Sequence, residues 1–94
     1  MSALEQFIDE SLIRSRKAGY IPTAFITMRN RYGSVEAIKR LVKSADLQSG
    51  FKKLKKLNLL DWSLEAAVVK FPNEFDREAI EFAKFRLKEA GFQS

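Results

Sequence analysis

The fold is decided by residues 19–43, whose sequence is GYIPTAFITMRNRYGSVEAIKRLVK. Gly19 and Gly33 are each placed to end a helix, because glycine tolerates the left-handed conformation that often follows a last helical turn. Pro22 suits the first turn of the helix between them, where its missing N–H group costs little. Ser34 is a suitable N-cap for the helix that follows. The stretch therefore predicts two short helices joined by a tight turn.

The rest of the chain shows the same apolar helical spacing between stop signals. The predicted helices cover residues 3–18, 22–32, 35–43, 51–57, 64–70 and 77–90. The predicted N-caps are Ser2, Ser34, Ser49, Asp61 or Ser63, and Asp76. Residues 66–69, AAVV, could instead form a buried strand, but nothing else in the chain could pair with it, so a helix is favoured. We expect an all-α fold, with residues 1–94 forming a single compact domain of five to six short helices.

Positive charge is concentrated in the middle of the chain. Residues 14–56 hold twelve basic side chains and two acidic ones, whereas the segments before and after carry net charges of −3 and −2. The net charge of the whole chain is +5. Phosphate-rich polymers bind where Lys and Arg side chains cluster, so the middle segment is where a polyanionic partner would bind. The charge alone does not say whether such a partner exists.

Two groups of cations in that segment form the candidate site, because each group lies opposite an apolar helix face. The predicted nucleic-acid-binding residues are Lys39, Arg40, Lys43, Lys52, Lys53, Lys55 and Lys56. They form one surface only if the two helices lie side by side and carboxylates do not neutralise the cations. No motif assigns a function. The leading hypothesis is therefore a non-enzymatic accessory module that contacts the phosphate backbone of DNA or RNA without base specificity.

Two other interpretations of the basic segment stay open. A charged face can serve only to keep a protein soluble. A helix-turn-helix that reads base sequence could run over residues 22–43, with Gly33 and Ser34 as its turn. That motif usually has a small residue four positions before the turn glycine and an apolar residue six positions after it. Arg29 and Lys39 occupy those positions, which argues against the motif.

The composition argues against catalysis and metal binding. The chain has no Cys and no His, so it lacks thiolate and imidazole ligands and any Ser-His or Cys-His nucleophile pair. Carboxylate pairs such as Asp76 with Glu81, or Asp9 with Glu10, are better explained as helix-end and surface charges. No glycine-rich phosphate loop and no calcium-loop spacing occurs. We expect no enzymatic activity, no cofactor, no metal and no small-molecule substrate.

The N-terminal residues are acidic and contain no long apolar run, which is unlike a signal peptide. No stretch of the sequence approaches the roughly 18 consecutive apolar residues of a membrane span. We therefore expect a cytoplasmic protein without a membrane partner.

Aromatic side chains near the C-terminus supply a rival hypothesis. The residues concerned are Phe71, Phe75, Phe82 and Phe85. Phe82 and Phe85 are expected to widen the inner face of the last helix, and Tyr20, Tyr32 and Trp62 to close the ends of the core. If two or three of the phenylalanines stay outside, they form an apolar patch that suits a partner or a second copy of the chain. The alternative function is a protein–protein interaction module, either a homodimer or a module whose basic face binds an acidic partner.

Several segments also carry a resemblance. They are GYIPTAF at 19–25, SGF at 49–51 with Leu54, LDWSLE at 60–65, and Gly91-Phe92. Together they resemble a small helical module of uncharacterised function in bacterial proteins, which occurs alone or appended to larger proteins, some of them nuclease-like or defence-associated. The resemblance implies a bacterial origin and an accessory role, and it assigns no binding residue.

Overall fold

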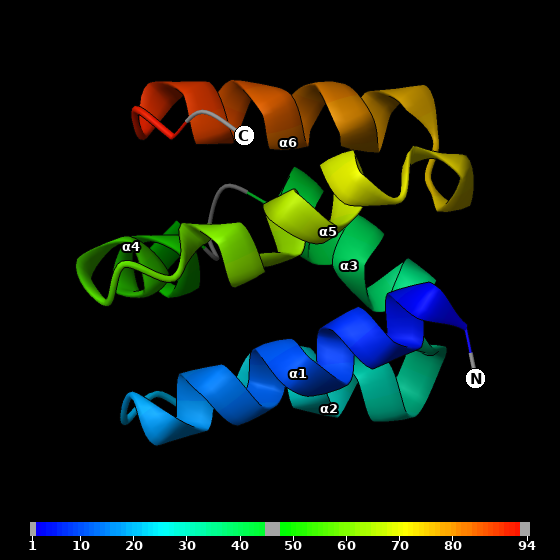
Figure 1. Cartoon of the computed structure of the whole chain (residues 1–94). Helices are drawn as coiled ribbons and strands as arrows, with labels where there is room; N and C mark the ends of the chain where they lie inside the picture. The colour runs from blue at the N-terminus through cyan, green and yellow to red at the C-terminus, as the bar shows by residue number, and fades with distance from the viewer. Residues whose placement is uncertain (1, 45–47, 93–94) are drawn as a thin grey trace.

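The computed structural model describes residues 2–44 and 48–92, with only the backbone of Gln48 and Ser49. This part of the chain contains six α-helices and no strand, which confirms the predicted all-α class (Figure 1). The helices are α1 (Ala3–Lys17), α2 (Thr23–Tyr32), α3 (Ser34–Lys43), α4 (Gln48–Lys56), α5 (Leu64–Lys70) and α6 (Arg77–Glu89). Two 3₁₀ turns, η2 (Leu60–Trp62) and η3 (Pro72–Glu74), lie on either side of α5.

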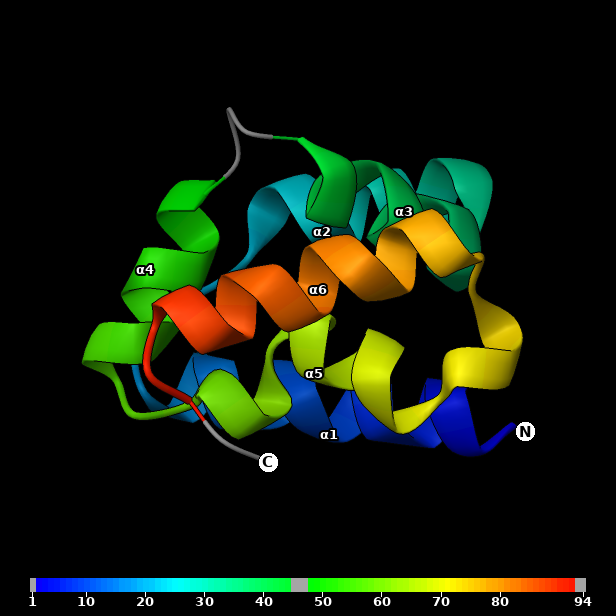
Figure 2. The ribbon, with the colours of Figure 1, turned by 90° about the horizontal axis from the view of Figure 1, so that it is seen from above.

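The helices are stacked in three layers (Figures 1 and 2). α1 and α2 form one outer layer, α3 and α5 lie in the middle, and α6 covers the middle layer on the other side. α4 lies at one end of the stack, beside the C-terminal half of α6 in both views. The middle segment of the chain therefore crosses the molecule, from the centre at α3 to the edge at α4.

α3 is the centre of the core because its apolar residues recur at helical spacing. Ala37, Ile38 and Val42 are fully buried and Leu41 nearly so. Buried residues outside α3 pack in the same cluster; they are Leu4, Ile8, Phe25, Ala67, Val68, Phe75, Ala79 and Ala83. The core thus joins five of the six helices, and α4 contributes no fully buried side chain among its described residues.

Most of the predicted helix ends are confirmed. Ser2, Ser63 and Asp76 cap α1, α5 and α6, and each side-chain oxygen accepts a hydrogen bond from the backbone N–H three residues later. Asn58 follows α4 with a φ of +60°, a left-handed conformation that Asn tolerates better than most residues. The predicted cap Ser49 lies inside α4, and its side chain is outside the described residues, as is the predicted connection at 45–47.

Ser34 does not cap α3, contrary to the prediction. Gly33 is the N-cap, and the Ser34 hydroxyl donates to Glu5 Oε1 at 2.7 Å and accepts from Arg29 Nε at 2.9 Å. Arg29 Nη2 also donates to Glu5 at 2.6 Å and lies 3.0 Å from Asp9 Oδ1. The hydrogen bonds from Arg29 and Ser34 hold the pKa of Glu5 below its ordinary value. The side chain of Ser34 therefore links α1 to α2 and α3 instead of capping the N-terminus of α3.

A buried ion pair joins α5 to α6. The side chains of Glu65 and Arg86 are only 6% and 12% exposed, and Arg86 Nη1 lies 2.7 Å from Glu65 Oε2. Arg86 Nη2 also donates to the carbonyl oxygen of Ser44 at 3.4 Å. Burial raises the pKa of Glu65, and the hydrogen bond from Arg86 opposes that rise. The pair fixes α6 to α5 and to the end of α3.

Replacing Arg86 with Met is expected to lower the free energy of unfolding by about 3–5 kcal/mol at pH 7, because the carboxylate of Glu65 stays buried without a partner. The loss should be smaller at pH 4. A carboxyl group whose folded-state pKa is raised favours the folded state below its unfolded pKa, and this contribution is lost as the pH rises through the folded pKa. Urea unfolding at the two pH values measures both effects.

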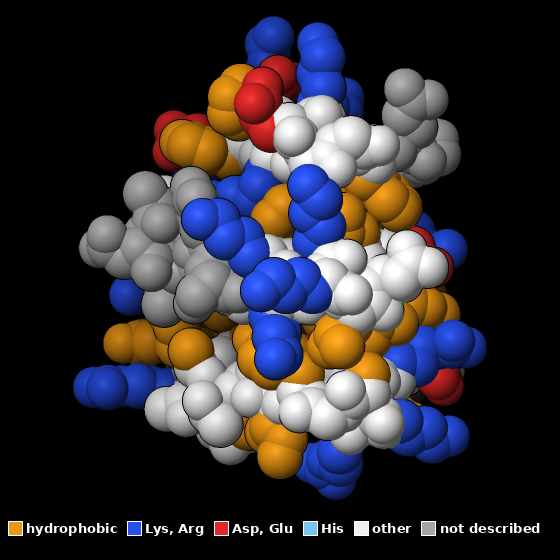
Figure 3. All heavy atoms as spheres, turned by 90° about the vertical axis from the view of Figure 1, so that its left-hand side faces the viewer, with side chains coloured by type: hydrophobic (Ala, Val, Ile, Leu, Met, Phe, Trp, Pro, Cys, Tyr) orange, Lys and Arg blue, Asp and Glu red, His pale blue; other side chains and the backbone are white. Residues whose placement is uncertain are grey.

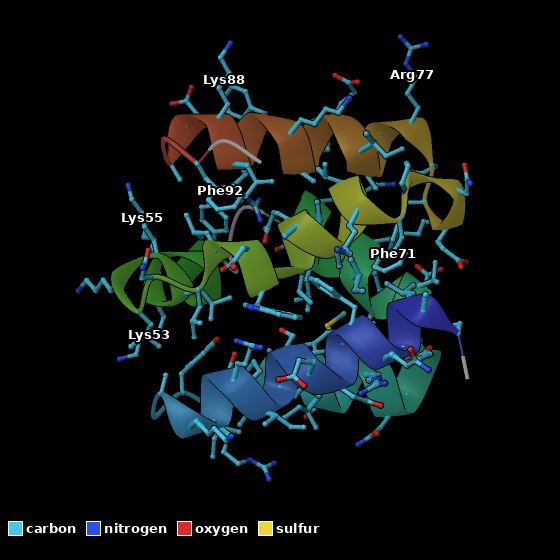
Figure 4. All side chains as sticks on the ribbon, viewed as in Figure 1. Lys53, Lys55, Phe71, Arg77, Lys88 and Phe92 are labelled. Atoms are coloured by element: carbon cyan, nitrogen blue, oxygen red, sulfur yellow. The ribbon has the colours of Figure 1, made fainter. Side chains whose placement is uncertain are left out.

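Arg77→Met is the matched control, because Arg77 is exposed at the start of the same helix and has no ion-pair partner within the described residues (Figure 4). Its free energy of unfolding should change by less than about 0.5 kcal/mol. Equal losses in the two variants would contradict a specific role for the buried pair.

Candidate nucleic-acid interface

The first part of the candidate site is α4, whose residues divide into an apolar and a basic side. Phe51 and Leu54 are half-buried, as is Leu57 just after the helix. At Gly50 an added Cβ would lie 2.8 Å from the hydroxyl oxygen of Tyr20, so glycine allows α4 to approach that ring closely. The other side of the helix holds four exposed lysines, as predicted. They are Lys52, Lys53, Lys55 and Lys56.

These four ammonium groups make no ion pair with the described residues. Lys53 and Lys55 point away from the body of the protein in Figure 4. Figure 3 faces the end of the molecule where α4, the last turns of α6 and the end of α1 lie, and it shows Lys and Arg side chains over the middle of the face. Hydrophobic surface is visible between them. α4 therefore presents four exposed lysines without ion-pair partners among the described residues.

The second part, on α3, differs from the prediction because carboxylates neutralise it. Lys39 Nζ and Lys43 Nζ lie 3.6 and 3.2 Å from Asp76 Oδ2, and Lys43 also lies 3.6 Å from Glu78 Oε1. Arg40 Nε lies 3.2 Å from Glu36 Oε2. The side chains of Lys39 and Lys43 are each 29% exposed. The condition that carboxylates leave the seven cations unpaired therefore fails for three of them.

Asp76 has two roles at this position. Its Oδ1 accepts a hydrogen bond from the N–H of Ala79 at 2.8 Å, which caps α6, while its Oδ2 faces the two lysines of α3. The Ala79 hydrogen bond and the contact with Lys43 hold the pKa of Asp76 below its ordinary value. The hydrogen bond with Asp76 in turn raises the pKa of Lys43. The capping role of Asp76 could be predicted from neighbouring residues. Its ion pairs with Lys39 and Lys43 could not, because they join segments more than thirty residues apart.

The two basic segments meet at one open hollow between α3, α4 and α6. Lys43 lies at its α3 end, and Lys52 and Lys55 form its α4 wall. The other lining residues are Phe51, Phe82, Phe85, Arg86, Glu89 and Ala90. The predicted adjacency therefore holds for Lys43 with Lys52 and Lys55. The other four predicted residues, Lys39, Arg40, Lys53 and Lys56, do not line the hollow.

Phe82 and Phe85 were expected to widen the inner face of α6, and this expectation is wrong. The residues are 42% and 64% exposed. The inner face of α6 is instead made by Ala79, Ala83 and Leu87, which are all buried. Phe82 and Phe85 lie on the side of α6 that faces the hollow and solvent.

The other aromatic residues mostly behave as predicted. Phe75 is buried, and Phe71 packs edge-on against Phe7. Trp62 stacks against Phe7, with ring centroids 4.8 Å apart, and Arg14 lies over its ring. Burial raises the pKa of Tyr20. Tyr32 departs from the prediction, because it is 41% exposed with Arg40 over its ring at 4.2 Å.

A cavity of about 110 Å³ is lined by residues of all six helices, and Glu65 and Arg86 are among them. The polar groups that line the cavity give no indication of a bound ligand, because no buried side-chain nitrogen or oxygen among the described residues lacks a hydrogen-bond partner. The same residues contain no group of three acidic, His or Cys side chains placed to hold a metal ion. Within residues 2–44 and 48–92, no helix is both long and apolar enough to cross a membrane.

α2 and α3 are separated by Gly33 alone, whereas a helix-turn-helix uses a turn of three or four residues. This geometry does not favour the sequence-reading alternative. Comparisons with protein-family models, curated proteins and solved structures found no match to the chain. The resemblance to a bacterial helical module therefore stays a prediction from the sequence.

The dual role of Asp76 predicts different results for two substitutions. Asp76→Asn keeps a capping oxygen and removes the charge that faces Lys39 and Lys43, whereas Asp76→Ala removes both. In urea unfolding at pH 7 we expect the order of stability to be wild type, then Asn, then Ala. A carboxyl group with a lowered folded-state pKa stabilises above its unfolded pKa, and this contribution is lost as the pH falls through the folded pKa. The gap between wild type and the Asn variant should therefore close on acidification, and a gap that is constant with pH would contradict the ion pairs.

Proposed function

We propose that the protein is a non-enzymatic module that contacts the phosphate backbone of nucleic acid through the four lysines of α4. The observation that carries the proposal is that these lysines are exposed and make no ion pair within the described part of the chain. Lys43 extends the surface at the edge of the hollow, where its pairing with Asp76 and Glu78 reduces its contribution.

The spacing of the lysines suits a polymer of phosphates. Lys52 and Lys56 are about 6 Å apart along the helix axis, since each residue adds about 1.5 Å. This is shorter than the Debye length of about 8 Å at physiological ionic strength, so the four charges act together on an approaching anion. No acidic residue occurs in α4 to offset them. The quartet thus presents a concentrated positive charge, and binding should depend steeply on salt.

Replacing Lys52, Lys53, Lys55 and Lys56 together with Gln is expected to weaken binding to mixed-sequence DNA and RNA to a similar extent. The slope of log affinity against log salt should also become shallower, by about 0.7 to 0.9 for each lysine that contacts a phosphate. Fluorescence anisotropy of labelled oligonucleotides at about 50 to 200 mM salt measures both quantities.

A charge-matched control replaces Lys70, Arg77, Lys84 and Lys88 with Gln. Both variants lower the net charge from +5 to +1, and Arg77 and Lys88 point away from α4 on the outer side of α6 (Figure 4). The control should keep most of the affinity. Equal weakening would show that only net charge matters, and no binding by the wild type at about 50 mM salt would exclude the proposal, since electrostatic binding is strongest there.

The rival function is a protein interaction module, and the exposure of Phe82 and Phe85 favours it. The discriminating measurement is the solution mass at protein concentrations from about 1 to 100 µM. Under the nucleic-acid proposal the protein stays monomeric in high salt. A dimer that persists at about 1 M salt, where electrostatic contacts are screened, would favour an apolar interface between two copies.

A further inference from the structure

We propose that Phe82 and Phe85 are stacking platforms for unpaired bases, so that the ligand of this face is single-stranded nucleic acid. The inference rests on the proposed function, because it requires the lysines of α4 to bind phosphates. It adds the class of nucleic acid and a second set of contacts. Single-strand binders commonly combine a positively charged groove with aromatic side chains on which bases stack.

The geometry places both kinds of contact on one hollow. Phe82 and Phe85 come from α6, and Lys52 and Lys55 come from α4 on the other side. The two phenylalanines are three residues apart on a helix, about 4.5 Å along its axis. That spacing suits neighbouring nucleotides of a flexible strand, because consecutive nucleotides rise about 3.4 Å along each strand of duplex DNA and an unpaired strand can extend further.

The charges of the hollow give the strand an orientation. The α4 wall carries two lysines without ion-pair partners among the described residues, whereas the α6 wall ends in the carboxylate of Glu89. Arg86 lies between them, but it is committed to Glu65. The phosphates would therefore follow α4, and the bases would turn toward α6, where the apolar rings lie.

A duplex makes no use of the exposed rings. Its bases are stacked inside and offer only their edges, and its backbone could contact the lysines while Phe82 and Phe85 stayed in water. A protein partner would also cover the rings, but the charge of the hollow favours a ligand that is anionic at every repeat. A single strand is the one polymer that offers a phosphate and an accessible aromatic surface at each unit.

The test compares three substitutions at Phe85 on two ligands. Phe85→Ala and Phe85→Leu remove the aromatic ring, and Phe85→Trp keeps one. The ligands are a labelled 15-nucleotide oligothymidine and a 15-unit abasic oligodeoxyribose phosphate, which has the same charges and no bases. Fluorescence anisotropy at about 100 mM salt gives the affinities. Because Phe85 is 64% exposed, these variants should keep the fold, which thermal unfolding followed by circular dichroism checks.

We expect Phe85→Ala and Phe85→Leu to bind oligothymidine about tenfold more weakly than the wild type, the loss typical of one stacked base. Phe85→Trp should bind at least as well as the wild type, and all four proteins should bind the abasic polymer alike. Glu89→Gln should strengthen the binding of both ligands, because it removes a negative charge from the hollow.

Two results would overturn the inference. One is an equal affinity of wild type and Phe85→Ala for oligothymidine, and the other is an equal loss on both ligands. If the proposed function holds and only the stacking fails, the wild type still binds the abasic polymer through the α4 lysines. Absence of binding to every oligonucleotide would exclude both proposals, and a dimer that Phe85→Ala dissociates would assign the rings to a second copy of the chain.

Discussion

The position of α6 against α3 and α5 is the constraint on which the candidate site depends. Asp76 holds the start of α6 near the lysines of α3, and the buried pair of Arg86 and Glu65 holds its second half against α5. Between these points Ala79 and Ala83 are fully buried, and their small side chains let the helix lie close to the core. Because the Ala79 and Ala83 side of α6 packs on the core, Phe82 and Phe85 lie outside the core and are exposed. The hollow beside α4 is a consequence of this arrangement.

The same contacts divide the cations of the middle segment into two classes. The acidic residues that follow in the sequence, above all Asp76 and Glu78, neutralise the basic side of α3. α4 lies at the end of the stack, and its lysines make no such contact with the described residues. The set of cations without ion-pair partners on the folded surface is thus smaller than the set of basic residues in the middle segment of the sequence. This division favours a ligand that binds at the edge of the molecule, where α4 lies.

The features that sequence predicted correctly are those set by neighbouring residues. Caps such as Ser2 and Ser63, the stop at Asn58 and the outward lysines of α4 follow from local spacing and backbone preference. Most of the errors concern residues whose partners are distant in the sequence; Arg40, whose partner Glu36 lies four positions before it, is an exception. Ser34 looked like a cap because its partner Glu5 on α1 could not be placed, and Lys43 looked solvated because Asp76 was assigned only a local role. Helical spacing alone also does not determine how much of the surface of α6 its neighbouring helices cover, which is why Phe82 and Phe85 were wrongly expected on its inner face.

The composition of α4 argues that its charge has a use beyond solubility. Lys52 and Lys55, Lys52 and Lys56, and Lys53 and Lys56 are each three or four positions apart, where like charges destabilise a helix by a few tenths of a kcal/mol per pair. A face kept only for solubility could alternate acidic and basic residues and gain stability from the same positions. α4 has no acidic residue, and the helix is short and packs through half-buried side chains. A bound polyanion would relieve this repulsion, so that ligand binding and the stability of α4 would reinforce each other.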